Sequence, residues 1–148
     1  MSNAIYLKLL EKAHKLGVPV YASDSVFETA HVLNIHLPDK RWILISALGL
    51  TCRGYNPVTV LAHELGHVVD CNARPWAYEE WGTGGCYGPT TWMSLMDVEM
   101  TAWDYAISLL KEAGFTDWAT FENDRARALE SYDARHNPWR ECHGLERA

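Results

Sequence analysis

The segment from Asn56 to Asp70 constrains the fold of this 148-residue chain more than any other stretch. Asn56 and Pro57 are a typical helix start, an N-cap residue followed by proline in the first helical position, and they predict a helix that ends at about Asp70. At about 100° per residue, His63, His67 and Asp70 share one side of this helix. The opposite side is apolar and consists of Val58, Leu61, Leu65, Val68 and Val69. We expect the apolar side to pack in the core and the histidine side to face a cleft.

Residues 63–67, His-Glu-Leu-Gly-His, match the pattern H-E-x-x-H, in which two imidazoles one helical turn apart can bind a single metal ion. A neutral imidazole nitrogen is a good zinc ligand, and a carboxylate directly after the first histidine can take a proton from water without binding the metal. The pattern predicts Zn²⁺ as the cofactor, His63 and His67 as ligands and Glu64 as the general base. Two histidines hydrogen-bonded inside a core remain the alternative.

Catalytic zinc usually takes three protein ligands, so a third one should lie elsewhere in the chain. A helix is predicted from Thr90 or Thr91 to Gly114, and Glu99 lies in the middle of its apolar stripe. A buried carboxylate is costly unless it is paired or binds a metal, which makes Glu99 the predicted third ligand. Asp97 and Asp104 fall on the opposite, solvent-facing side.

Two alternatives to this ligand set stay open. Glu99 can instead form a buried ion pair with an arginine such as Arg53. Asp70 can be the third ligand, or it can accept a hydrogen bond from His67 and so fix the tautomer of that histidine. His31 and His36 are expected to be structural, because a lone histidine in a strand is rarely a ligand.

The rest of the chain predicts a mixed α+β fold in a single domain spanning residues 1–148, with a small mixed or antiparallel sheet. Residues 3–16 have the spacing of an amphipathic helix, and alternating apolar residues between His31 and Ala47 predict a β-hairpin. A last helix is predicted after a Thr116 cap, running to about His136.

Residues 71–88 show no period and are rich in glycine and aromatic residues, which predicts a long loop. The loop is equally compatible with a mobile lid and with an ordinary surface loop. Tyr87, Arg53 or another nearby tyrosine can supply a hydrogen bond to a developing oxyanion. Cys71 and Cys86 are expected to be free thiols without a role in metal binding.

Charge and hydropathy exclude several function classes. The chain has 13 basic and 19 acidic residues, and a net charge of −6 opposes direct binding to nucleic acid. No apolar run approaches the roughly 20 residues of a membrane helix, and no secretory signal is visible. We therefore expect a soluble protein with no membrane partner, in the cytoplasm.

The residues Leu61 to His67, followed by Glu99 and Ala102-Trp103, resemble the zincin metallopeptidases with a glutamate third ligand, and within them the ImmA/IrrE-like group. The resemblance implies a zincin-like α+β fold with a small sheet whose edge strand holds an extended peptide, and Trp42 to Ala47 is the candidate edge. It also implies a phage or prophage origin and a protein substrate such as a transcriptional regulator. The chain departs from the group in having no helix-turn-helix segment and in its long loop after the second histidine.

These observations predict a zinc metallopeptidase that hydrolyses a peptide bond in a protein partner, with Glu64 as general base. The alternative is a zinc-binding interaction or inhibitor protein that binds a host factor without cleaving it. A non-peptide hydrolase with the same metal site is a third possibility. The sequence leaves the natural substrate and the oligomeric state open.

Overall fold

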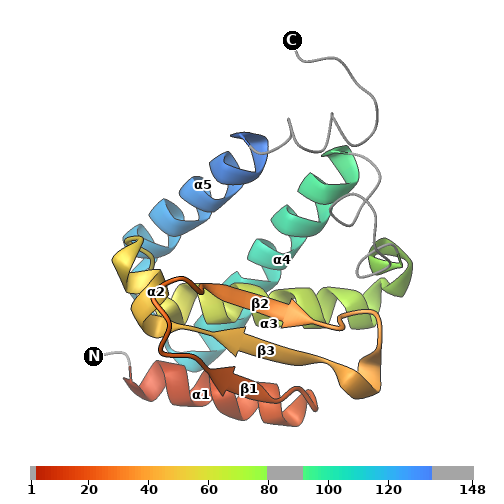
Figure 1. The fold of residues 1–148 in the computed structure, drawn as a ribbon, viewed down its shortest axis with the longest axis horizontal. Coiled ribbons are helices and arrows are strands. Elements are labelled where there is room, and N and C mark those ends of the chain that lie inside the picture. Colours follow the sequence, from red (N-terminus) through yellow and green to blue (C-terminus); the bar gives the residue numbers. More distant parts are fainter. Residues whose placement is uncertain (1–2, 80–91, 135–148) are drawn as a thin grey trace.

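The computed structural model describes residues 3–79 and 92–134 of the chain, which form a mixed α+β fold with a small three-stranded sheet, as predicted (Figure 1). The helices are α1 (Asn3–Lys15), α2 (Ala47–Cys52), α3 (Pro57–Ala73), α4 (Trp92–Ala113) and α5 (Trp118–Ala134). The strands are β1 (Val20–Ala22), β2 (Ala30–Leu33) and β3 (Trp42–Ile45), and two short 3-10 helices are η1 (Pro38–Lys40) and η2 (Pro75–Tyr78). Within these residues, no helix combines the length and the apolar character that crossing a membrane requires.

The strand order is β1-β3-β2, so β3 lies in the centre of the sheet. The prediction that Trp42 to Ala47 forms an edge strand is therefore wrong. It failed because β1, a strand of three residues that the sequence did not reveal, pairs in parallel with the far side of β3. The predicted hairpin is confirmed in the antiparallel β2–β3 pair, although its first strand ends at Leu33. The next residue, Asn34, has a φ of 56°, a left-handed conformation that takes the chain out of the sheet.

Among the residues that the structure describes, no strand pairs with the outer edge of β2, which carries the backbone groups of Ala30 and Val32. In an antiparallel pair, successive residues turn their N–H and C=O groups alternately toward and away from the partner strand. The Ser46 N–H donates to the carbonyl oxygen of Thr29 at 2.7 Å, so Thr29 and, two residues on, His31 face β3. Ala30 and Val32 must then face away from β3, toward the open edge.

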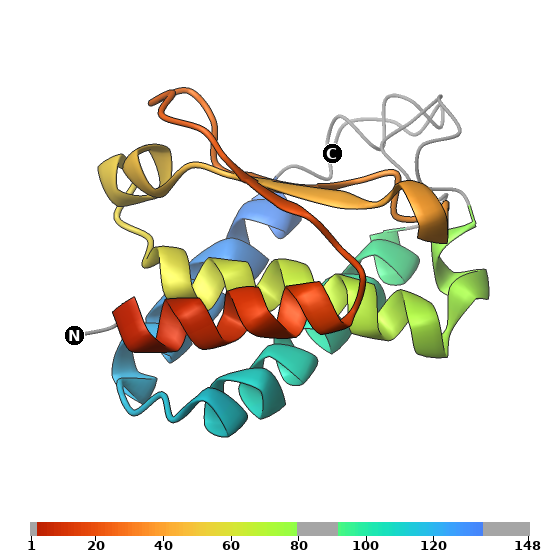
Figure 2. The same ribbon diagram turned by 90° about the horizontal axis from the view of Figure 1, so that it is seen from below.

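The helix predicted from Asn56 to Asp70 is confirmed as α3, which continues to Ala73. The Asn56 side chain accepts a hydrogen bond from the Val58 N–H at 2.9 Å, as expected of an N-cap. Figure 2 shows the sheet as a layer above α1 and α3, with α4 running below them. The histidine side of α3, expected to face a cleft, is instead buried: His63 is 3% exposed and His67 4%.

The helices flanking α3 agree with the sequence patterns. Residues 3–16 form α1, and the predicted third and fourth helices correspond to α4 and α5 within one or two residues where the structure describes them. The predicted cap of α5 is off by one residue. Asp117, not Thr116, accepts the Thr120 N–H at 3.3 Å and the Thr120 hydroxyl at 2.6 Å.

α2 is a six-residue helix that the sequence patterns did not predict. Ser46 caps its N-terminus, where the Ser46 hydroxyl oxygen accepts the Gly49 N–H at 3.0 Å. Gly49 lies directly against the loop of residues 23–29, because a Cβ at this position would overlap the carbonyl oxygen of Glu28. The absence of a side chain at Gly49 thus allows the loop to pack on α2.

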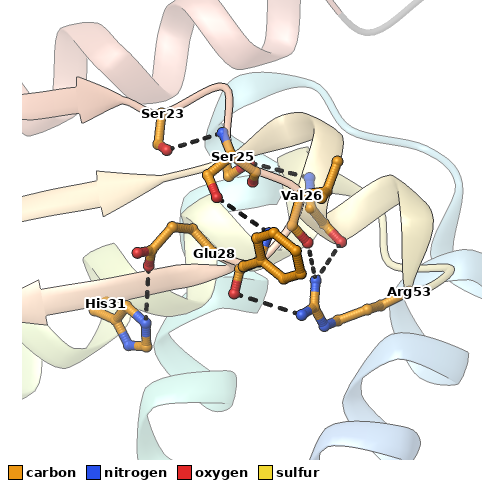
Figure 3. A network of polar contacts seen from close by, with 9 residues as sticks. Ser23, Ser25, Val26, Glu28, His31 and Arg53 are labelled. Atoms are coloured by element: carbon orange, nitrogen blue, oxygen red, sulfur yellow. Dashed lines mark hydrogen bonds and ion pairs between the residues drawn. The ribbon is translucent and has the colours of Figure 1, made fainter.

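Arg53 follows α2 and binds this loop, as Figure 3 shows. Its guanidinium donates to the carbonyl oxygens of Val26 at 2.9 Å and of Phe27 at 3.5 Å. The proposed ion pair between Arg53 and Glu99 is therefore wrong, because the guanidinium is occupied by backbone carbonyls of the loop. Phe27 itself is 86% exposed on this well-held loop.

Candidate metal centre

The structure brings His63, His67 and Glu99 together, with one ligand atom from each lying within 4.8 Å of the others. Nε2 of His67 is 2.9 Å from one Glu99 carboxylate oxygen, and Nε2 of His63 is 3.4 Å from the other. All three side chains are buried. The three residues predicted as metal ligands thus lie at one place, where α3 meets α4.

The close crossing of α3 and α4 depends on Gly66, which lies between the two histidines in the sequence. A Cβ on Gly66 would overlap the carbonyl oxygen of Ala102 in α4. Ala102 is three residues after Glu99 and so lies on the same face of α4. Glycine at this position therefore lets the backbone of α4 approach closely enough for Glu99 to contact both histidines.

The exposure of the carboxylates on α4 agrees with the predicted apolar stripe that contains Glu99. Glu99 is 3% exposed, whereas the side chains of Asp97 and Asp104 are 57% and 66% exposed. The predicted separation of one buried carboxylate from two surface carboxylates is confirmed.

The charges in the site strongly perturb its protonation equilibria. Burial alone would raise the pKa of Glu99, but the charge of His67 and the imidazole nitrogens of both histidines close to the carboxylate hold that pKa well below its ordinary value. Burial and the charge of His67 lower the pKa of His63. The pKa of His67 is raised, because the nearby Glu99 carboxylate outweighs the effect of burial. Glu99 is thus an anion between two imidazoles.

His63 offers a direct test of whether the site suits a metal ion. Within the described residues, neither of its ring nitrogens makes a hydrogen bond, although both are buried. The Glu99 oxygen near Nε2 lies at 3.4 Å but outside hydrogen-bonding geometry. The indole of Trp103 stacks on the ring at 4.2 Å between centroids and covers one of its faces. A buried nitrogen without a partner is costly, and two imidazoles with one carboxylate are a donor set that zinc accepts, so these residues fit zinc.

Glu64 lies next to this cluster but is not one of its three ligand groups. It is 8% exposed and makes a hydrogen bond with the backbone of Val32, on the open edge of β2. Burial raises the pKa of Glu64 to about 8, with a further contribution from the negative charge of Glu99. A carboxyl group with a pKa in this range can both accept and donate a proton near neutral pH, as a general acid–base group must.

Asp70 does not belong to the ligand group, and Tyr78 links it to His67. The Tyr78 hydroxyl lies 3.1 Å from Nδ1 of His67 and donates a hydrogen bond to Asp70 Oδ2 at 2.9 Å. The sequence reasoning missed Tyr78, because it lies beyond α3 in the loop predicted for residues 71–88. Its participation follows from η2, which turns the chain back toward the helix.

The remaining candidates lie away from the metal ligands or outside the described residues. His31 is half exposed and lies 3.9 Å from Glu28, on the surface of the sheet (Figure 3). Cys71 is a buried free thiol whose Sγ lies 3.5 Å from the carbonyl oxygen of Ile35. Tyr87 and Cys86, and with them half of the loop predicted for residues 71–88, lie outside the described residues.

Comparison of the chain with protein-family models, with curated proteins and with solved structures finds no match. Any functional conclusion therefore rests on the residues of the chain itself.

Proposed function

We propose that this protein is a zinc-dependent peptidase of the H-E-x-x-H type, in which His63, His67 and Glu99 hold Zn²⁺ and Glu64 is the general base. The observation that carries the proposal is the convergence of these three ligand groups within 4.8 Å, with Glu64 directly beside them. When bound, zinc supplies a Lewis acid that polarises a carbonyl group and makes water more acidic. The proposed resemblance to the ImmA/IrrE-like zincins rests on the same residues.

Glu64 performs the proton transfers in this proposal. Its carboxylate takes a proton from the attacking water and then gives it to the nitrogen of the leaving amine. The hydrogen bond with the backbone of Val32 holds the carboxyl group beside the strand edge. Removal of the acid–base function without a change in shape, as in Glu64→Gln, should therefore abolish turnover but leave the zinc ligands intact.

The open edge of β2 is where an extended polypeptide substrate would bind in this proposal. Ala30 directs its backbone N–H and C=O outward, and main-chain hydrogen bonds to such groups can add a strand to a sheet without fixing its sequence. Glu64 lies beside this edge, because its carboxyl group is hydrogen-bonded to the backbone of Val32. A protein partner such as a transcriptional regulator, encountered in the cytoplasm, is the proposed substrate class.

The test combines metal content with cleavage of an unstructured protein. Purified wild-type protein should contain about one zinc per chain, and Glu99→Gln should lose most of it. Glu64→Gln should keep the zinc and lose cleavage, by about 100-fold or more. The matched control is Glu112→Gln, a glutamate on the same helix as Glu99 whose side chain is 68% exposed. Absence of zinc after reconstitution, or full cleavage by Glu64→Gln, would overturn the proposal.

A zinc-binding interaction protein is the second candidate, and the exposed Phe27 on its tightly held loop favours it. A large apolar side chain on a rigid loop is a typical contact in protein–protein interfaces. The two candidates differ in the role of Glu64. Binding of a partner should survive Glu64→Gln, whereas hydrolysis should not.

A further inference from the structure

A chain of polar groups, buried except for the partly exposed Arg74, lies behind His67, on the side of the ring away from Glu99. It starts at Arg74, passes through Asp70 and Tyr78, and reaches Nδ1 of His67. Asp70 and Tyr78 are both 0% exposed. Buried polar groups of this kind are stable only when each donor faces an acceptor, so the direction of every hydrogen bond can be worked out.

The carboxylate of Asp70 fixes the direction of the whole chain. Nε of Arg74 donates a hydrogen bond to Asp70 Oδ1 at 2.6 Å, and Nη2 donates one to Oδ2 at 2.9 Å, so both carboxylate oxygens are acceptors. The Tyr78 hydroxyl has a single proton, which it donates to Asp70 Oδ2. Toward His67 the Tyr78 oxygen can then only accept. Nδ1 of His67, at 3.1 Å, must therefore carry a proton.

We propose that Tyr78 and Asp70 are positioning residues that keep a proton of His67 on Nδ1, so that Nε2, the nitrogen on the side of Glu99, is the one that binds the metal. Nε2 is the nitrogen that faces Glu99, at 2.9 Å. The consequence for metal binding rests on the zinc site proposed above, whereas the assignment of the proton rests on the hydrogen bonds alone. Ordered partners of metal-binding histidines typically change metal affinity by about 10- to 100-fold.

The two histidines of the site differ in this respect. Among the described residues, Nδ1 of His63 has no hydrogen-bond partner. His67 is thus the anchored ligand, whose ring orientation is set before metal binding, and His63 is the less constrained one. The Arg74 guanidinium also donates a hydrogen bond to Asp97 at 2.9 Å. This bond connects the hydrogen-bonded chain of Arg74, Asp70 and Tyr78 to α4, two residues before Glu99.

The test uses Tyr78→Phe and Asp70→Asn, with Tyr21→Phe as the matched control. Tyr21 is on β1, is 54% exposed and makes an edge contact with Trp42 rather than with the site. The first readout is the ¹⁵N spectrum of histidine-labelled, metal-free protein at alkaline pH, which shows which ring nitrogen carries the proton. The second readout is zinc affinity, measured by competition with a chelator.

In the wild type and in Tyr21→Phe, His67 should be protonated on Nδ1 and the zinc affinities should agree within about twofold. In Tyr78→Phe the proton should shift toward Nε2, and zinc affinity should fall by about 10- to 100-fold. Because Asp70 acts through Tyr78, the double variant should bind zinc about as weakly as Tyr78→Phe alone, a non-additivity that independent structural damage would not produce.

The proposal is overturned if Tyr78→Phe keeps the proton on Nδ1, or if the effects of the two substitutions on zinc affinity simply add. If the wild type binds no zinc but loses its Nδ1 proton in Tyr78→Phe, the positioning role stands and the proposed zinc site fails. Should Tyr78→Phe not fold, the same two readouts on Asp70→Asn decide the question, because an unchanged spectrum there overturns the proposal.

Discussion

At the scale of single residues, the candidate site consists of ionisable side chains that are buried. The sequence made the convergence of His63, His67 and Glu99 predictable, since the two histidines are one turn apart and Glu99 lies in an apolar stripe. Tyr78 was not predictable, because its contact with His67 depends on how the chain turns after α3 rather than on spacing along a helix. The same limit explains the Arg53 hypothesis, since charge complementarity alone cannot show that loop carbonyls occupy the guanidinium.

The raised pKa of Glu64 predicts how the stability of the metal-free protein depends on pH. This pKa rises from 4.5 to about 8 on folding, so between these values the folded state binds more protons than the unfolded state. The contribution of Glu64 to the free energy of unfolding therefore falls as the pH rises from about 4.5 to about 8. Glu64→Gln removes the reduction, and it should stabilise the protein by roughly 1–3 kcal/mol near pH 8 and by less near pH 5.

Denaturant unfolding at both pH values, with a chelator present, measures this effect. The exposed Glu112→Gln serves as control and should change stability by less than about 0.5 kcal/mol at either pH. A Glu64→Gln protein no more stable than wild type near pH 8 would contradict the assigned direction of the pKa shift.

At the scale of elements, length decided what could be predicted. The long amphipathic helices α1, α3 and α4 show several periods of their patterns, so their positions were predictable to within a few residues. β1 has three residues and α2 has six, which is too short for any periodicity to show. The position of β3 in the sheet could not be predicted either, because it depends on the pairing with β1.

The crossing of α3 and α4 predicts an unusual response to Gly66→Ala. Helix propensity alone would make alanine more stable than glycine by about 1 kcal/mol. Here the added Cβ meets the carbonyl oxygen of Ala102, so the helices must move apart. We expect a loss of about 1–3 kcal/mol in unfolding free energy, together with a weaker zinc affinity.

Gly49→Ala is the matched comparison for this prediction. Its Cβ would overlap the Glu28 carbonyl oxygen in the loop of residues 23–29, so it should also destabilise the protein. Zinc affinity should stay at the wild-type value, because Gly49 does not lie between the ligand-bearing helices. Equal zinc affinities for wild type and Gly66→Ala would show that the helix crossing does not set the site geometry.

At the scale of the whole molecule, the proposed metal ion joins two helices that carry much of the core. Its ligands come from α3 and α4, which meet correctly only in the folded chain. Ligand binding to the folded state alone stabilises it by RT ln(1 + [L]/Kd), or about 2.7 kcal/mol at 100 times Kd. We therefore expect zinc to raise the unfolding temperature of the wild type in a concentration-dependent way.

Thermal unfolding with and without added zinc measures this coupling. His63→Ala and Glu99→Gln should lose the zinc-dependent shift, whereas Glu112→Gln should keep it in full. A shift of the same size in His63→Ala would place zinc elsewhere on the chain.

The short strand β1 has a consequence for how the protein fails under stress. Three residues cover one whole side of β3, whose sequence Trp42–Ile45 is entirely apolar. If β1 detaches, the backbone groups of Ile43 and Ile45 that bond to it become an unprotected, apolar edge. Such an edge recruits strands from other molecules, so partial unfolding at this end of the sheet leads toward aggregation and not simply toward a looser monomer.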